Sequence, residues 1–374
     1  MCKKHFEHVG SFLRPAELVE AREKFAKGEI TQEELTAVED RLITELVDKQ
    51  VAVGLEKVTD GEFRRANWHV DYFWGFDGIE RLQYGEGLHF VGVETNDDSA
   101  VVTGKIKFTK ENHPFIKHFE FVKKLADERG VEAKITIPSP SQCLAELQRG
   151  TNLQEALKHY STIEELIEDL AVAYRDSILA LYEAGARTIQ LDDCSWNILI
   201  DDNFYQNITK GHVPKDAIRE RLLGINNAAL VDLPADLRIN THVCRGNYQS
   251  THLTEGPYTE VAEALFGREN AKSYFLEYDN ERSGGFEPLA EFKDPEKVAV
   301  LGLVTTKDGK LEDKDQLVAR VKEASKYIPL EQLWVSTQCG FASTAEGNLI
   351  TDEDQWNKLK LVKEVIDEVW GEKK

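Results

Sequence analysis

The sequence predicts an α/β protein of the (β/α)8 barrel class, and three observations predict it. Short apolar runs alternate with longer amphipathic segments along the 374 residues, which is the order expected of right-handed βαβ units and a parallel sheet. Eight apolar runs can be counted, and this number favours a closed barrel over an open sheet. No glycine-rich phosphate loop follows the first run, which argues against a dinucleotide-binding fold.

The eight predicted strands are short, and several of them contain almost no polar residue. The run Val298–Val304 reads Val-Ala-Val-Leu-Gly-Leu-Val, as expected of a strand that is buried on both faces. In chain order the predicted strands are His8–Phe12, Lys57–Glu62, Ala133–Pro138, Thr188–Asp193, Arg238–Cys244, Tyr274–Tyr278, Val298–Val304 and Trp334–Cys339.

The segments between the strands have helical patterns. Residues 31–53 begin with a capping box at Thr31 and Glu34, and residues 162–183 and 352–369 are amphipathic with a helical period. Residues 85–110 break this rhythm, because polar and apolar residues alternate around Asn96-Asp97-Asp98. We predict an inserted β-hairpin there, within one catalytic barrel that spans residues 1–374.

The charge balance excludes some partners. Lys and Arg number 46 and Asp and Glu 67, a net charge of −21, so nucleic acid and anionic membranes are poor partners. The amino-terminal residues lack the apolar stretch of a signal peptide, and no apolar run reaches membrane-spanning length. We therefore expect a cytoplasmic protein with reduced cysteines. The five cysteines are Cys2, Cys143, Cys194, Cys244 and Cys339.

Reactive residue types gather at the predicted carboxyl ends of strands, which meet on one face of a barrel. The clearest set is His242, Cys244, Glu277 and Cys339. His242 and Cys244 are two residues apart, so their side chains share one face of a strand. One imidazole, two thiolates and a carboxylate suit tetrahedral zinc. A buried histidine beside a buried cysteine is also a common core pairing, and we expect Cys143 and Cys194 to be core thiols.

Six short motifs resemble, in order and in chemical type, those of the C-terminal barrel of cobalamin-independent methionine synthase. The resemblance covers nearly the whole chain. The motifs are Val9-Gly10-Ser11-Phe12-Leu13-Arg14-Pro15, Asp60-Gly61-Glu62, Gln190-Leu191-Asp192-Asp193, Thr241-His242-Val243-Cys244, Leu276-Glu277 and Gln338-Cys339-Gly340.

The resemblance implies a role for each of the site residues. His242, Cys244, Glu277 and Cys339 would hold zinc, as their chemistry suggests. Glu62 and Asp192 would be the catalytic carboxylates that bind the amino group of homocysteine, and the backbone around Ser11 would receive its carboxylate. The structural alternatives are a salt bridge from Glu62 to Arg64 or Arg65, and a hydrogen bond of Asp192 below the barrel mouth.

The sequence departs from the family on the side of the methyl donor. The complete family enzyme has two barrels, and this chain has room for one. Pro140 stands near the place of the family's folate-stacking tryptophan. The loop Val304–Asp308 contains no histidine, whereas the family has one in this loop as its proposed general acid. Asp308, His69 and Tyr72 are candidate acids by position alone.

The predicted function is zinc-dependent transfer of a methyl group to homocysteine, forming methionine, with 5-methyltetrahydrofolate as the family's donor. Three alternatives stay open. The first is another zinc-thiol alkyl transferase of the superfamily, with a methylcobamide or sulfonium donor or a different thiol. The second, a decarboxylase of the uroporphyrinogen type, is disfavoured by the acidic balance. The third is a non-catalytic zinc-binding barrel. The oligomeric state is left open.

Overall fold

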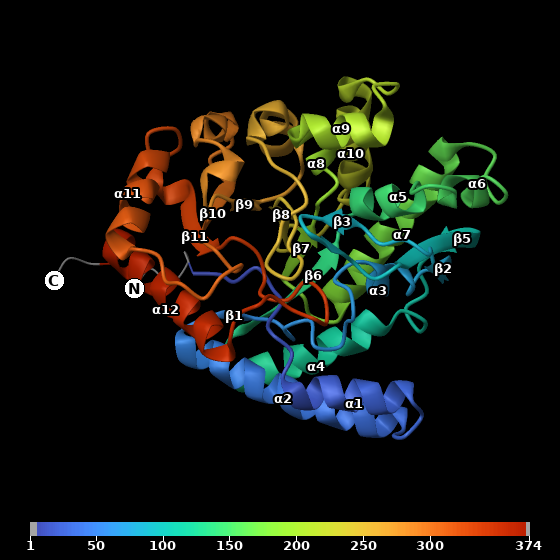
Figure 1. Ribbon diagram of the computed structural model, residues 1–374, viewed down its shortest axis with the longest axis horizontal. Coiled ribbons are helices and arrows are strands. Elements are labelled where there is room, and N and C mark those ends of the chain that lie inside the picture. Colours follow the sequence, from blue (N-terminus) through green and yellow to red (C-terminus); the bar gives the residue numbers. More distant parts are fainter. Residues whose placement is uncertain (1–5, 372–374) are drawn as a thin grey trace.

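A curled sheet of parallel strands forms the centre of the protein, and long helices surround it (Figure 1). The computed structural model describes residues 6–371. Every neighbouring pair in this seven-stranded sheet is parallel, so the predicted barrel class is confirmed. The strands, in spatial order, are β1 (Lys57–Val58), β6 (Glu132–Pro138), β7 (Thr188–Asp192), β8 (Arg238–Val243), β9 (Ser273–Glu277), β10 (Val298–Val304) and β11 (Leu333–Thr337).

The predicted first strand, His8–Phe12, is wrong as a strand, although the segment occupies the eighth position of the barrel. Its contact with β11 is a single parallel bridge between Phe6 and Val335. The carbonyl groups of the segment accept hydrogen bonds from interior side chains instead of a neighbouring strand. These are Lys134 Nζ to His8 O, Gln190 Nε2 to Val9 O (2.7 Å) and Thr59 Oγ1 to Gly10 O (2.8 Å). Buried backbone groups need partners, and here side chains supply them.

The long helices lie outside the sheet. They are α1 (Ala16–Ala26), α2 (Gln32–Val53), α4 (Pro114–Glu128), α7 (Ile163–Glu183), α10 (Lys215–Ala229), α11 (Lys314–Ala324) and α12 (Asp352–Trp370). The predicted capping box of Thr31 and Glu34 begins α2, as expected of that pattern. The predicted helices at 162–183 and 352–369 correspond to α7 and α12.

Shorter helices occupy the connections between these elements. They are α3 (Val70–Phe73), α5 (Pro140–Leu147), α6 (Asn152–Ala156), α8 (Asn197–Ile200), α9 (Asp202–Thr209), the π-helical η3 (Glu263–Arg268), and the 3-10 turns η2 (Tyr258–Glu260), η4 (Glu281–Ser283), η5 (Glu287–Glu291) and η6 (Leu330–Gln332). Within the described part of the chain, no helix combines the length and apolarity that crossing a lipid bilayer requires.

The antiparallel insertion differs from the predicted hairpin in one of its strands. β5 (Asp98–Lys107) pairs with β2 (Asp77–Gln83), which begins before residue 85. The residues between them form a small hairpin of β3 (His89–Phe90) and β4 (Val93–Glu94). The tip of this small hairpin reaches the loop after β8, where Val91 N donates to His252 O (3.2 Å). The insertion therefore borders the carboxyl end of the barrel.

Two apolar layers hold the barrel together. Inside, β10 contributes Val298 and Val300 to a small cluster with Phe275 and Trp334. Outside, Leu301 of the same strand packs into the large core between sheet and helices. Consecutive residues of a strand face opposite ways, so a strand that is apolar throughout can serve both layers.

Leu301→Ala is expected to lower the free energy of unfolding by about 2–5 kcal/mol, because it removes buried methyl groups and leaves a cavity. Leu301 is completely buried. The matched control is Leu349→Ala, since Leu349 is 75% exposed and should tolerate the same change. Urea denaturation followed by circular dichroism measures both. Equal midpoints for the two variants would contradict the assigned packing.

Candidate metal centre and active site

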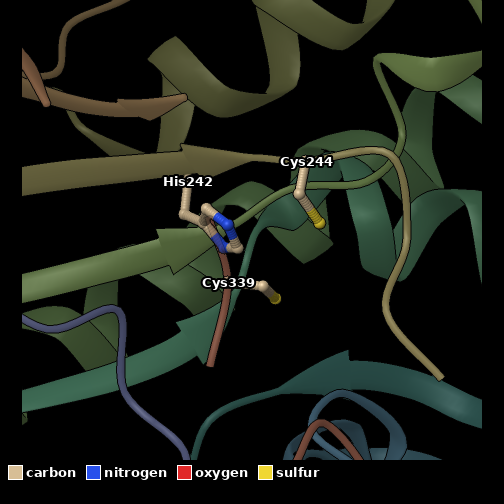
Figure 2. Close-up of side chains that lie close together, drawn as sticks. All are labelled: His242, Cys244 and Cys339. Carbon is tan, nitrogen blue, oxygen red and sulfur yellow. The ribbon is translucent and has the colours of Figure 1, made fainter. Parts of the chain in front are cut away.

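Three predicted metal ligands come together at the carboxyl end of the barrel. His242 is in β8, Cys244 follows the end of β8, and Cys339 lies in the turn after β11. One ligand atom from each lies within 4.8 Å of the other two, and all three residues are buried. Figure 2 shows the imidazole and the two sulfur atoms facing a common space. The parallel strands bring together residues that are nearly one hundred positions apart in the chain.

The imidazole of His242 is suited to binding a metal ion. Its Nε2 is buried and has no hydrogen-bond partner, which is costly for a polar atom unless something else satisfies it. Its Nδ1 lies 3.3 Å from Oδ1 of Asp192. A carboxylate on the far nitrogen is the usual support for a metal-bound histidine, because it fixes the orientation of the ring. The donor set therefore fits a zinc ion.

The ionisable groups of the cluster shift one another's pKa values. Hydrogen bonds from the thiols of Cys194 and Cys339 lower the pKa of Cys244 well below its usual range, and His242 adds to this. Burial lowers the pKa of His242, but the Cys244 thiolate and Asp192 outweigh burial and raise that pKa to about 10. Cys244 is therefore the sulfur that carries negative charge, and a thiolate is the form that binds metals.

Cys194, which we expected to be a core thiol, lies beside this cluster. Its Sγ is 3.9 Å from Sγ of Cys244, and the residue is only half-buried. It follows β7 two residues after Asp192, so its place at a strand end was the sequence signal that pointed here. Cys143, the other expected core thiol, is completely buried in α5.

Glu277, the fourth predicted ligand, is not part of the group of ligand atoms within 4.8 Å. Its Oε1 accepts hydrogen bonds from Arg282 Nε (3.2 Å) and Nη2 (2.8 Å). Its Oε2 accepts from Arg245 N and Gln338 Nε2, both at 3.0 Å. Burial raises the pKa of Glu277, but Lys307 and Arg282 outweigh burial and lower it. The carboxylate is thus ionised, and protein groups satisfy it.

Glu62 presents an unpaired carboxylate oxygen next to the cluster. It follows β1 with φ +61°, a left-handed conformation that non-glycine residues rarely adopt and that often marks functional sites. Its Oε1 accepts from Thr136 Oγ1 (2.9 Å), while its buried Oε2 has no partner. Burial raises the pKa of Glu62 to about 7, with Asp192 adding to the effect and Arg65, 3.5 Å away, opposing it.

Asp192 faces both His242 and Glu62. Its Oδ1 accepts a hydrogen bond from Gln190 Nε2 (2.8 Å) and is the oxygen that lies near His242. Because its charge raises the pKa of Glu62, the two predicted amino-binding carboxylates are electrostatic neighbours. The hydrogen bond from Gln190 is a contact that the structural alternative for Asp192 expects, and the amino-binding role stays a prediction.

Ser11 is held against the loop that follows β11. Its Oγ accepts from Ala342 N (3.2 Å), and its carbonyl accepts from Phe341 N (3.0 Å). A Cβ on Gly340 would lie 2.0 Å from Ser11 Oγ and 2.9 Å from Ser11 N. Glycine at 340 is therefore a steric requirement of this close approach.

Arg14, which the sequence did not single out, joins three loops at the barrel mouth. Its Nη1 donates to Ala342 O (2.7 Å) and Phe12 O (3.0 Å), and its Nη2 donates to Glu62 O (2.8 Å). Burial lowers the pKa of Arg14 to about 10, so the guanidinium stays charged at neutral pH. This residue therefore connects the segment at Ser11 with the loop that carries Glu62.

Comparison with known proteins identifies the family. The family described as "Cobalamin-independent synthase, Catalytic domain" matches residues 155–353, which is more than half of the chain. The chain belongs to this family. The resemblance noted in the sequence is thereby confirmed.

Three relatives illustrate the match. An uncharacterized protein of Bacillus subtilis, YxjH, is 41% identical over 97% of this chain and 94% of its own. A methionine synthase of Sulfolobus acidocaldarius is 26% identical over 89% of this chain and 84% of its own. A solved structure from Listeria monocytogenes, provisionally named a vitamin-B12-independent methionine synthase, is 40% identical, with a TM-score of 0.76 and 98% coverage of both chains.

The loop after β10, where the family places its histidine, carries Lys307 in this chain. The Nζ of Lys307 donates to Gly246 O (3.2 Å) and Asn247 Oδ1 (3.4 Å), both in the loop after β8. Its charge lowers the pKa of Glu277 and opposes the rise in the pKa of Cys339. Lys307 is thus a cation that this loop brings to the candidate metal centre.

The three candidate acids lie in different surroundings. Asp308 is exposed, and its Oδ1 is 3.8 Å from Lys358 Nζ. Tyr72 is buried in the core, where its hydroxyl bonds to Ser177 Oγ (2.8 Å) and burial raises its pKa. The ring of His69 lies tilted against that of Trp68, with centroids 4.6 Å apart, and burial lowers the pKa of His69 to about 3. Trp68 N donates to Ser343 O, which places this pair beside the β11 loop.

Glu62→Gln is expected to stabilise the folded protein above pH 7 and to change little at pH 5 or below. Because the folded pKa is raised from 4.5 to about 7, the unfolded chain ionises first, and wild-type stability falls as pH rises through this window. The gain at pH 8 is at most about 3 kcal/mol. Thermal melts at pH 5 and pH 8 measure it.

The control for this prediction is Glu120→Gln, which changes an exposed carboxylate of α4. Its melting temperature should follow that of the wild type at both pH values, since isolated surface substitutions have small effects. A Glu62→Gln variant that gains nothing between pH 5 and pH 8 would contradict the raised pKa.

Proposed function

We propose that this chain transfers a methyl group to the thiol of homocysteine, forming methionine, and that the reaction depends on zinc. The observation that carries the proposal is the unpartnered Nε2 of His242, which faces Cys244 and Cys339 beside the carboxylates of Glu62 and Asp192. Family membership supports methyl transfer in methionine synthesis. The zinc ion, the thiol substrate and the methyl donor go beyond what family membership supports, and they are proposed here.

The proposed substrate pose places the ammonium group between Glu62 and Asp192. The free Oε2 of Glu62 is a buried acceptor without a partner, and a cationic donor would satisfy it. The carboxylate of the substrate would lie toward the segment at Ser11, which Arg14 holds against the Glu62 loop. A substrate anchored at both groups would direct its sulfur toward Cys244 and Cys339.

The protein residues prepare the sulfur for attack. A bound zinc ion lowers the pKa of a coordinated thiol, so that its thiolate is available at neutral pH. Asp192 keeps the ring of His242 oriented, and the buried thiolates exclude harder metal ions in favour of a soft one. The carboxylates at 62 and 192 align the thiolate with the methyl carbon, and the carbon–sulfur bond forms as the bond to the donor breaks.

The choice of donor decides what else the site must supply. A folate nitrogen needs a proton on leaving, whereas a cobalt-bound methyl or a sulfonium needs none at the leaving atom. General acid assistance is typically worth about 10²–10⁴-fold. The family's histidine is absent from the loop after β10, where this chain carries Lys307. The case for homocysteine as the thiol substrate is therefore stronger than the case for a folate as the methyl donor.

Metal analysis followed by a donor screen tests the proposal. We expect one zinc per chain, and we expect methionine to form from homocysteine with one of three donors. These are monoglutamyl 5-methyltetrahydrofolate, methylcobalamin and a methylsulfonium such as S-methylmethionine. Cys339→Ser should lose zinc and activity together, whereas Cys143→Ala, which removes a thiol in α5, should keep both. Tight zinc without methionine from any donor would favour a non-catalytic zinc-binding barrel.

Glu62→Gln should raise the KM for homocysteine about 10- to 100-fold, because a charge-assisted hydrogen bond worth about 1.5–3 kcal/mol is weakened. Asp192→Asn should raise it as well and should also weaken zinc binding, since Asp192 contacts His242. The control substrate is 4-mercaptobutyrate, which lacks the amino group, and its KM should be unaffected by Glu62→Gln. An equal loss with both thiols would indicate that Glu62 does not bind the amino group.

A further inference from the structure

A chain of polar side chains crosses the interior of the barrel, from its amino-terminal end to the candidate site. It begins at Lys57, the first residue of β1, whose Nζ donates to Glu7 Oε1 (2.5 Å). The other oxygen of Glu7 lies 3.6 Å from Nζ of Lys134 in β6. Lys134 donates to Gln190 Oε1 (3.1 Å), and Gln190 Nε2 donates to Asp192 Oδ1 (2.8 Å). The chain therefore ends on a carboxylate of the candidate site.

The position of Lys134 is costly for the folded protein. Its side chain is 1% exposed, and burying an ammonium group costs free energy unless charges and hydrogen bonds compensate it. Burial lowers the pKa of Lys134 to about 8, and the charges of Glu7 and Asp192 oppose that fall. Apolar residues fill the adjacent part of the interior, where Lys134 Nζ lies 4.8 Å from the ring centroid of Phe275. Packing alone therefore does not explain a lysine at this point.

The amide of Gln190 links this lysine to the site, and its neighbours allow only one orientation of the amide. An ammonium group can only donate hydrogen bonds, so it faces the amide oxygen. The amide nitrogen then faces two acceptors, Val9 O (2.7 Å) and Asp192 Oδ1. A reversed amide would place its oxygen against both acceptors and its N–H groups against Lys134. The ammonium group and the carbonyl thus determine that Gln190 presents a donor to Asp192.

The hydrogen bond from Gln190 restricts the carboxylate of Asp192. The oxygen that accepts this bond, Oδ1, is also the atom 3.3 Å from Nδ1 of His242. An oxygen held between these two groups cannot rotate away from the imidazole without losing a hydrogen bond. The orientation of Asp192 is therefore set from within the barrel, before any ligand binds.

We propose that Lys134 is a positioning residue, which acts through Gln190 to fix the carboxylate of Asp192 at the site. This inference rests on the proposed zinc-dependent function, in which Asp192 orients the ring of His242 and binds the amino group of the substrate. Lys134 itself takes no part in bond making or breaking. It also donates to the carbonyl of His8 and so anchors the irregular segment, which is a structural role that the test has to separate from positioning.

Zinc affinity and homocysteine kinetics of the full-length protein test the positioning role. Lys134→Met removes the ammonium group. It should weaken zinc binding about 10-fold and raise the KM for homocysteine by a similar factor, at the lower end of the loss of about 10- to 100-fold that is typical when the outer partners of a metal ligand are removed. The KM for 4-mercaptobutyrate, which lacks the amino group, should not change. Lys134→Arg keeps a cationic donor and should restore part of both losses.

The matched control is Lys297→Met, which removes another buried lysine. Lys297 directly precedes β10, at the end of the barrel opposite the site, and its Nζ donates to the carbonyls of Phe266 and Glu269, both at 2.8 Å. In urea denaturation this variant should lose stability, as Lys134→Met does. Its zinc affinity, measured by competition with a chelator, and its KM for homocysteine should stay at wild-type values.

A double-mutant cycle with Asp192→Asn distinguishes positioning from a purely structural role. If Lys134 acts through Asp192, then Lys134→Met should add little to the loss of zinc affinity once Asp192 is replaced, whereas independent effects would multiply. Multiplied losses, or wild-type zinc affinity and KM in Lys134→Met, overturn the role of Lys134 and leave zinc-dependent transfer intact. A wild-type protein that binds no zinc overturns both.

A second variant covers the case in which Lys134→Met does not fold. Gln190→Met keeps the lysine but removes the amide that links it to Asp192. It must show the same rise in the KM for homocysteine, and no added loss of zinc affinity in combination with Asp192→Asn, for the inference to stand.

Discussion

The orientation of the His242 ring is the constraint on which the rest of the site depends. Asp192 lies 3.3 Å from one ring nitrogen, and the other nitrogen is buried and unpartnered. The pairing of β7 with β8 puts Asp192 directly opposite His242 in the sheet register. A carboxylate in this position settles which nitrogen faces the two thiols. The geometry of the candidate metal centre is therefore a consequence of strand pairing, and a small change in register would move Asp192 away from His242.

The closure of the barrel by an irregular segment has a second consequence. A regular strand at residues 8–12 would direct its carbonyl groups to its neighbours. Here the carbonyls of His8 and Val9 point inward to Lys134 and Gln190, and the next residues are free to turn toward the loop after β11. This is how Ser11 comes to lie against Gly340, one residue after Cys339. The segment at Ser11 and the turn that carries Cys339 thus position each other.

Some features of the site lower the stability of the folded chain. Glu62 combines a left-handed backbone, a buried carboxyl and an oxygen without a partner. Each of these features destabilises the folded chain, and a cationic ligand is the simplest means of offsetting the last two. Glu277, by contrast, is just as buried, but four donors satisfy it. The contrast between the two carboxylates is that protein donors satisfy both oxygens of Glu277 and leave one oxygen of Glu62 without a partner.

The sequence by itself determined the barrel class, the long helices and the choice of His242, Cys244 and Cys339 as candidate ligands, because periodicity and motif order are local properties of a chain. Only the tertiary structure decided which polar groups are already satisfied. It replaced the predicted strand His8–Phe12 by an irregular segment, gave β5 a partner outside residues 85–110, paired Glu277 with Arg282 and brought Cys194 to Cys244. Hydrogen-bond satisfaction depends on neighbours distant in sequence, and no spacing rule can report it.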